Sequence, residues 1–418
     1  MKEEKLLWLM NDIDDAYIKE ASEYRTEAEP KEAPERKFSF RKQWIRYGAI
    51  AAACLIAAVA AYGLLPGDGN GNDGKNTVLK SETESDLPTL SVEHYAAKMK
   101  EPDEKFGNPS QESDGNPWVP DAEVETLPVY ENIAYAGEAD RQAAPVSNEA
   151  LKETIQMTAA AMDMTVKDVE YHDGEGNSQD ETDQDGISYK ATAHTDTGTI
   201  TVTYNSFIKV EYDQPQSLPE EYTVAAEDMT NESAEEITEY LLGEYGKLMG
   251  FSNPKASIRM FYDSDGQAKW IFSGYDDNGD SLQEQIVSYN LKRMRFELDE
   301  NGQLIGIAML DNLASGRKIE EYPIITAEEA KELLSRGEYV TNHSTSPKIE
   351  NIEKEALIYL TGPECNIFMP YYAFDVRIDE KDGGLICYST YYVPAVKEEY
   401  LDKMPASDVG QSSAAQDD

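Results

Sequence analysis

The chain has 418 residues, enough for two or three domains, and carries a formal net charge of −44. A surface this acidic repels nucleic-acid phosphates and anionic lipid, so the sequence predicts no nucleic-acid partner. Only three cysteines are present, which excludes a small disulfide-rich scaffold. The fold is therefore expected to rest on a hydrophobic core.

Residues 47–65 form the longest apolar stretch of the chain, YGAIAAACLIAAVAAYGLL, without a single charge. A helix of this length rises about 28 Å, close to the thickness of a bilayer's hydrocarbon core. Five basic residues precede it without an intervening acid: Arg36, Lys37, Arg41, Lys42 and Arg46. The stretch after it is acidic and rich in Gly and Asn. By the positive-inside rule the pattern predicts a single-pass membrane protein with residues 1–46 in the cytoplasm and the rest outside.

Two other interpretations of this stretch remain. A cleaved signal peptide would have a shorter leader than 46 residues and a cleavage site of small residues, neither of which is seen. A buried helix of a soluble domain is compatible with the high alanine content. Length and flanking charge together favour the transmembrane helix.

Residues 3–24 have the spacing of an amphipathic helix. Its apolar positions recur every three or four residues, and acidic side chains occupy much of the opposite face. Such a helix has no domain of its own to cover the stripe, so a signalling protein in the cytoplasm or membrane is the expected partner. The predicted partner-binding residues are Leu6, Met10, Ile13, Tyr17 and Tyr24.

The remaining chain predicts an α+β fold: a disordered acidic stalk, then about three modules of one helix with an antiparallel sheet. The helices are expected at 147–162, at a capping box of Ser233 and Glu236, and at a second box of Thr326 and Glu329. Asp-Gly or Asn-Gly pairs at 265–266, 278–279 and 301–302 predict hairpins. The predicted domains are 1–46, 47–65 (span), 66–125 (stalk), 126–222, 223–318, 319–402 (modules) and 403–418 (disordered tail). The predicted strands are 127–130, 169–172, 187–195, 198–211, 256–263, 267–275, 284–298, 304–310, 355–360, 371–378 and 385–393.

No motif for catalysis, nucleotide binding or metal binding is present, so the sequence predicts no enzyme, no cofactor and no metal. Residues 276–280, DDNGD, resemble the start of a calcium loop but lack its later glycine and glutamate, which favours a plain hairpin turn. Cys365 and Cys387 could pair, although nothing in the sequence requires it. Tyrosine pairs at 371–372 and 391–392 suit half-buried strands, and exposed glycan-binding ladders are the alternative.

Two parts of the sequence resemble known families. Residues 323–330 (PIITAEEA), 357–376 (LIYLTGPECNIFMPYYAFDV) and 388–396 (YSTYYVPAV) resemble the YycH/YycI-type accessory regulators of Gram-positive bacteria. This resemblance implies extracytoplasmic modules of helix and sheet that restrain a membrane histidine kinase through a membrane helix. Residues 6–21 (LLWLMNDIDDAYIKEA) resemble the cytoplasmic leader of clostridial anti-sigma-like membrane proteins. The leader is longer than a YycI-type protein needs and shorter than a full anti-sigma domain.

The leading hypothesis is a non-catalytic membrane regulator or sensor whose inner helix engages a histidine kinase or a sigma factor. The alternative is an anchored surface protein that binds a ligand, which the sequence does not identify, or serves a structural role, with the inner helix only extending the anchor. An exported enzyme has no supporting motif.

The predicted topology can be tested by cysteine labelling of intact cells. A cysteine introduced at Ser81 is expected to react with a membrane-impermeant maleimide, whereas one at Ser22 is expected to be protected. Labelling at both positions, or at Ser22 alone, would contradict a cytoplasmic N-terminus.

Overall fold

A computed structural model describes residues 87–91, 105–109, 114–134, 147–173, 189–204, 206–262, 266–343, 345–361, 365–380 and 386–405. The chain divides into two compact units, 1–43 and 44–418, and all described residues belong to the second. That unit is a mixed fold of helices and mainly antiparallel sheet, as the sequence predicts. All pairs of named strands are antiparallel.

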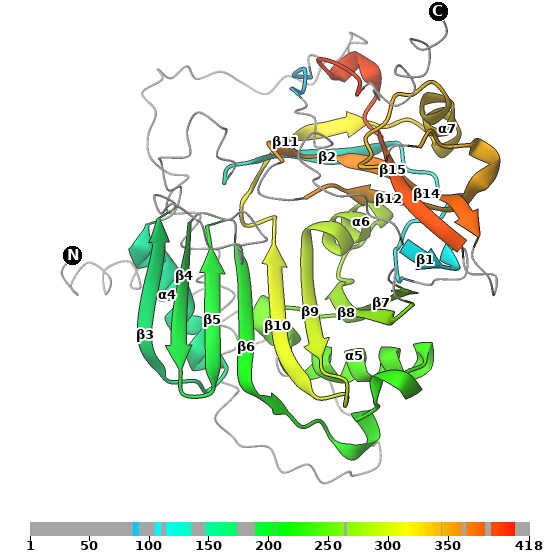
Figure 1. Cartoon of the computed structure of the whole chain (residues 1–418). Helices are drawn as coiled ribbons and strands as arrows, with labels where there is room; N and C mark the ends of the chain where they lie inside the picture. The colour runs from blue at the N-terminus through cyan, green and yellow to red at the C-terminus, as the bar shows by residue number, and fades with distance from the viewer. Residues whose placement is uncertain are drawn as a thin grey trace, which may run out of the picture. The chain divides into compact units, whose positions relative to one another are not determined.

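Strands from all three predicted modules enter one 12-stranded sheet in the order β12-β14-β15-β1-β7-β8-β9-β10-β6-β5-β4-β3 (Figure 1). In this spatial order, we call the strands from β7 through β10 to β3 the large section of the sheet. The strands β12, β14 and β15 form its small section, and β1 lies between the two sections. The bounds are β1 Lys105–Gly107, β3 Val166–Asp173, β4 Tyr189–Thr195, β5 Gly198–Thr203, β6 Phe207–Gln216, β7 Pro254–Tyr262, β8 Ala268–Asp276, β9 Lys292–Leu298, β10 Leu304–Asp311, β12 Ile352–Tyr359, β14 Pro370–Glu380 and β15 Ile386–Pro394.

Two helices cover one face of the large section (Figure 1). α4 Asn148–Ala161 begins at the N-cap Ser147, and its Leu151, Ile155 and Ala159 are buried at the four-residue spacing seen in the sequence. α5 Asn231–Tyr245 buries Ile237, Leu241 and Leu242 in the same core. The opposite face of these strands carries the alternating polar residues.

The small section packs with a second sheet of three strands, β2 Thr126–Asn132, β11 Gly316–Pro323 and β13 Ile367–Phe368, in the order β11-β2-β13. α7 Ala327–Ser335 begins with the predicted capping box of Thr326 and Glu329, which the structure confirms. Its Leu333 and Leu334 join a core with Phe374 of β14 and Leu127 of β2.

The structure corrects the strand predicted at 284–298, because its first half is a helix, α6 Leu282–Leu291. Ser281 accepts a hydrogen bond from the N–H of Glu284, and the Glu284 carboxylate accepts one from the N–H of Ser281. This capping box satisfies the free N–H groups of the first turn. The hairpin predicted at residues 278–279 is wrong for the same reason, since that loop leads from β8 into α6. The Asn301-Gly302 turn does join β9 to β10, with Gly302 at φ 74°.

Two boundaries also differ from the prediction. α5 begins one turn before the expected cap, because Thr230 is the N-cap and Ser233 is the residue that bonds back to it. The strand predicted at 198–211 is two strands, β5 and β6, which form an antiparallel hairpin. The chain reverses between them, where Ser206 adopts a left-handed φ of 62°.

The disordered stalk expected at 66–125 is wrong for its described parts. β1 is an internal strand of the large sheet, Leu90 is buried beside Leu401, and Trp118 is only 4% exposed. A low apolar content is compatible with order here because each segment docks on a surface made by distant residues.

Some predictions lie outside the described residues. These are the inner helix at 3–24, the span at 47–65 and most of the tail at 403–418. Within the described part of the chain, no helix is long and apolar enough to cross a bilayer. The transmembrane helix therefore stays a prediction.

Two glycine substitutions test the packing of α5 on the sheet. A Cβ added to Gly274 of β8 would lie 2.4 Å from Leu242 Cδ1 and 2.8 Å from the carbonyl oxygen of Lys255, so Gly274→Ala should destabilise the fold by about 1–3 kcal/mol. Gly243 lies in α5 with no atom near its added Cβ, so Gly243→Ala should stabilise by about 0.5–1 kcal/mol. Urea unfolding measures the free energy of unfolding of both variants. Equal changes in the two variants would contradict the close packing of α5 on β8.

Candidate functional site

The candidate site is the junction between the two sections of the large sheet. β1 is three residues long and pairs with β15 at Tyr388, Cys387 and Ile386, but with β7 only at Tyr262. β7 and β15 are each nine residues long, so β1 covers only a third of their length. Residues 114–118, a few positions after β1, bond to both β7 and β12.

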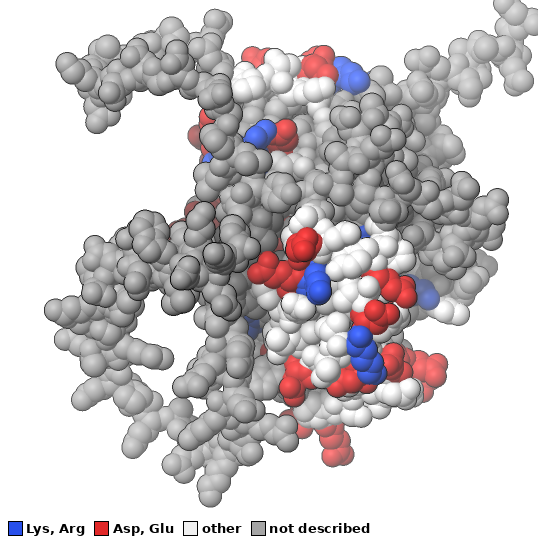
Figure 2. All heavy atoms as spheres, turned by 90° about the vertical axis from the view of Figure 1, so that its left-hand side faces the viewer, with Lys and Arg blue, Asp and Glu red and all other residues white. Residues whose placement is uncertain are grey.

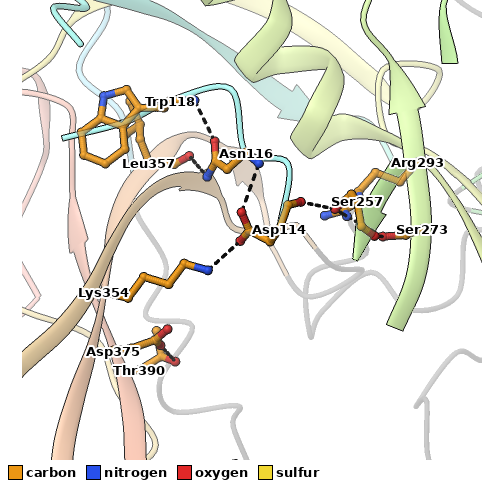
Figure 3. A network of polar contacts seen from close by, with 10 residues as sticks. All are labelled: Asp114, Asn116, Trp118, Ser257, Ser273, Arg293, Lys354, Leu357, Asp375 and Thr390. Carbon is orange, nitrogen blue, oxygen red and sulfur yellow. Dashed lines mark hydrogen bonds and ion pairs between the residues drawn. The ribbon is translucent and has the colours of Figure 1, made fainter. Parts of the chain in front are cut away.

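Asp114 is the centre of this junction (Figure 3). Its Oδ2 accepts a hydrogen bond from Lys354 Nζ on β12 at 3.1 Å, and its Oδ1 accepts one from the N–H of Asn116 at 3.1 Å. Its main-chain oxygen accepts a hydrogen bond from Ser257 Oγ on β7 at 2.5 Å. One 9%-exposed residue therefore connects both sections of the sheet.

Two buried serines and an arginine extend the network into the large section. Arg293 of β9 donates from one guanidinium nitrogen to Ser257 Oγ at 2.8 Å and to Ser273 Oγ at 2.7 Å. Ser273 Oγ donates in turn to the main-chain oxygen of Ser257 at 2.9 Å. The guanidinium also lies 4.6 Å from the centre of the Tyr289 ring, an attractive cation–π arrangement. Hydrogen bonds thus link side chains of β7, β8 and β9 next to the segment that contains Asp114.

The sequence DGNPW at 114–118 produces the local conformation of the segment. Asp114 and Asn116 form the same kind of turn, in which the side-chain oxygen accepts a hydrogen bond from the N–H two residues later. For Asn116 this donor is the N–H of Trp118, 3.0 Å from Oδ1. Gly115 adopts a left-handed φ of 70°, and an added Cβ would lie 2.8 Å from the carbonyl oxygen of Ala256. Trp118 then packs edge-on against Tyr372 of β14, with the ring centres 5.6 Å apart. Turn chemistry and one large aromatic side chain position the segment.

The electrostatics of Asp114 favour its ionised form. Burial alone would raise the pKa of Asp114, but Lys354, the N–H of Asn116 and the nearby Arg259 together lower it below its ordinary 3.8. On the other side of Lys354, Asp375 occupies the cross-strand position on β14 and accepts a hydrogen bond from Thr390 Oγ1 at 2.6 Å. Lys354 thus lies between two buried carboxylates. The arrangement is suited to holding two strands together, and no bond-breaking chemistry follows from it.

The residues singled out from the sequence are not brought together here. Leu6, Met10, Ile13, Tyr17 and Tyr24 lie outside the described residues. Cys365 and Cys387 are both buried, and no disulfide joins them.

The acidic loop at 276–280 uses its first two residues to shape the turn before β7. Asp276 Oδ1 accepts from the N–H groups of Ser252 and Asn253 at 3.0 and 2.7 Å, and Asp277 pairs with Lys255 at 3.6 Å. Within the described part of the chain, no group of three or more acidic, histidine or cysteine side chains is placed to hold a metal ion.

The tyrosine pairs serve packing, the interpretation favoured from the sequence. Tyr371, Tyr372 and Tyr391 are buried. The hydroxyl of Tyr372 donates to the carbonyl of Ile325 at 2.8 Å, and that of Tyr391 to the carbonyl of Thr345 at 2.7 Å. Buried hydroxyls with partners are typical of a core.

On the side of the molecule at the left of Figure 1, acidic and basic side chains are interspersed over the described surface (Figure 2).

Sequence reasoning missed Asp114, Asn116 and Trp118, although a signal was present. Tryptophan is rare in this chain, with four in total, and one of them follows two residues that favour tight side-chain-capped turns. A large aromatic side chain beside such turns indicates docking better than disorder. Lys354 and Arg293 carried no comparable signal, because their partners are distant in sequence.

Comparisons with known proteins identify no function. No protein-family model matches the chain, and no curated protein matches it. A crystal structure of an uncharacterized protein from Eubacterium rectale ATCC 33656 is similar over 66% of this chain and 84% of that chain, with 12% identity and a TM-score of 0.28. A similarity of this degree carries no structural or functional argument.

The junction predicts that Asp114 contributes more to stability than a surface ion pair. Asp114→Asn should lower the free energy of unfolding at pH 7 by about 2–4 kcal/mol, because it leaves Lys354 half-buried beside a neutral side chain. Glu131→Gln is the control, since its pair with Arg317 is exposed and should contribute less than about 1 kcal/mol. Urea unfolding measures both.

The pH dependence of stability tests the ion pair between Asp114 and Lys354. A carboxyl group whose pKa is lowered in the folded state stabilises the protein above its unfolded pKa, near 3.8, and loses this contribution as the pH falls further. The difference between wild type and Asp114→Asn should therefore be complete at neutral pH and shrink below about pH 3.8. A difference that stays constant down to pH 2 would show that Asp114 acts through its shape alone.

Proposed function

We propose that this protein is a non-catalytic, single-pass membrane regulator or sensor of a Gram-positive bacterium. Its acidic extracytoplasmic region couples to a signalling partner, a histidine kinase or a sigma factor, through the span and the inner helix. The proposal combines the predicted topology with the position of residues 105–118 in the fold.

The junction is the observation that carries the proposal. In the predicted topology, β1 and Asp114 follow the span at a distance of some forty to fifty residues, so they are the first parts of the outer chain to enter the large sheet. They contact both sections of that sheet, through β7 on one side and through β15 and Lys354 on the other. A change in the angle between the two sections would therefore move the segment that leads back to the membrane.

On the cytoplasmic side, the apolar stripe provides the coupling surface. Burial of four of its large side chains would contribute on the order of 6–10 kcal/mol before the cost of ordering, which is sufficient for a specific partner. An isolated helix of about twenty residues is only marginally stable in water. Binding to a partner would therefore explain why one face of this helix is apolar.

The test is a crosslinking pull-down from native membranes. Wild type is expected to recover a signalling protein that is lost from the double variant Ile13→Asp and Tyr17→Asp, because two carboxylates in the stripe cannot be buried without a large desolvation cost. Asn11→Asp with Ser22→Asp is the matched control, since it adds the same charge to the polar face of the predicted helix.

Recovery of the same proteins from wild type and from both double variants would remove the signalling proposal. The membrane-anchored surface protein, with ligand-binding or structural duties, would then be the better account. Loss of the partner from the stripe variant alone supports docking through the apolar face.

A further inference from the structure

One arginine forms no hydrogen bond and no ion pair within the described part of this very acidic chain. Of the six arginines described, Arg317, Arg336 and Arg377 pair with glutamates. Arg293 donates to Ser257 and Ser273, and Arg259 also has partners. Arg295 forms no hydrogen bond and no ion pair with any described residue. In a chain with 81 acidic residues, a guanidinium that forms no ion pair within the described part of the chain is unexpected.

The position of Arg295 leaves its guanidinium accessible. It lies in the middle of β9, where the alternate residues Met294 and Phe296 are buried in the core with α5. Arg295 therefore points to the sheet face away from α4 and α5, and its side chain is exposed. Its cross-strand neighbours, Ser273 on β8 and Ala308 on β10, are both short. Neither of them can cover the charge.

The charges around Arg295 add to its own. The Arg293 guanidinium reaches over Ser273, the direct neighbour of Arg295. Lys209 of β6 lies opposite Ala308, one strand further on. The nearest carboxylate, Glu297, is 3.6 Å from Lys209, which also pairs with Glu211 at 3.0 Å. Burial by the surrounding sheet and the charges of Arg293 and Arg259 lower the pKa of Arg295 below its ordinary 12.5, and the carboxylate of Glu297 offsets part of this effect.

We propose that Arg295 anchors a binding site for an anionic group of the carboxylate or phosphate class. The planar guanidinium offers a fork of donors that matches two oxygens of either group. Arg293 and Lys209 contribute positive charge from the same face of β9 and β6. A bound anion would add to the carboxylate of Glu297 in offsetting the repulsion of Arg295 by Arg293 and Arg259. The site does not depend on the proposed signalling function.

The test is the thermal unfolding of the full-length chain in sodium phosphate or sodium acetate, with the ionic strength held constant by sodium chloride. At a concentration tenfold above the dissociation constant, the binding anion should raise Tm by about 2–5 °C. Arg295→Gln should abolish the shift. Arg336→Gln should retain it, because Arg336 is an exposed arginine paired with Glu338 elsewhere on the fold. A response to only one of the two anions identifies the class of ligand.

A second variant controls for the possibility that Arg295→Gln loses binding because it misfolds. Arg295→Lys keeps the charge but lacks the fork, so it should fold and bind the anion about tenfold more weakly than wild type. Three results would overturn the proposal: no shift of wild type with either anion, an equal shift in Arg295→Gln, or an equal shift when chloride alone is increased. The partner pull-down does not report on this site, so the two proposals can fail separately.

Discussion

The buried carboxylate of Asp114 is the constraint on which the joining of the two sections depends. A charge taken out of water is costly unless oppositely charged groups and hydrogen-bond donors surround it. Asp114 meets this requirement only where Lys354 and the N–H of Asn116 converge, with Ser257 holding its main chain. These groups come from β12, β7 and the 114–118 segment, so Asp114 makes all of these bonds only when both sections of the sheet are in place.

Apolar packing alone would fix this arrangement less tightly, because hydrophobic contacts have little directional preference. The two sections have largely separate cores, one beneath α4 and α5 and the other around α7 and the three-stranded sheet. α6 reaches across as well, since Asn290 accepts a hydrogen bond from the N–H of Tyr359 on β12 at 3.1 Å. Directional polar bonds between the sections thus define their register where the apolar cores do not.

The strand β9 brings the junction and the proposed anion site close together. Arg293 faces the Asp114 segment and donates hydrogen bonds to Ser257 and Ser273, whereas Arg295, two residues further on the same face, is exposed. An anion at Arg295 would change the electrostatic environment of Arg293 over a distance well within the Debye length at physiological salt. The proposed anion site and the Asp114 segment are thus connected through neighbouring residues of one strand.

Elements whose information is local could be predicted from the residues alone. The four-residue spacing of Leu151, Ile155 and Ala159 predicted α4, and the capping box of Thr326 and Glu329 predicted the start of α7. A similar box at Ser281 and Glu284 was present but hidden by residues that also suit a strand, so α6 was predicted wrongly. The predicted span and inner helix rest on the same kind of local pattern.

The way in which distant segments meet became visible only in the assembled fold. The insertion of β1 between β7 and β15 and the docking of residues 114–118 depend on contacts between residues more than one hundred positions apart. Asp114 looks like one more acid in a polar stretch until Lys354 is placed beside it. Arg295 likewise looks like any surface arginine until the register shows Ser273 and Ala308 on either side. Local propensity sets the elements, whereas burial and pairing of charge are properties of the assembled fold.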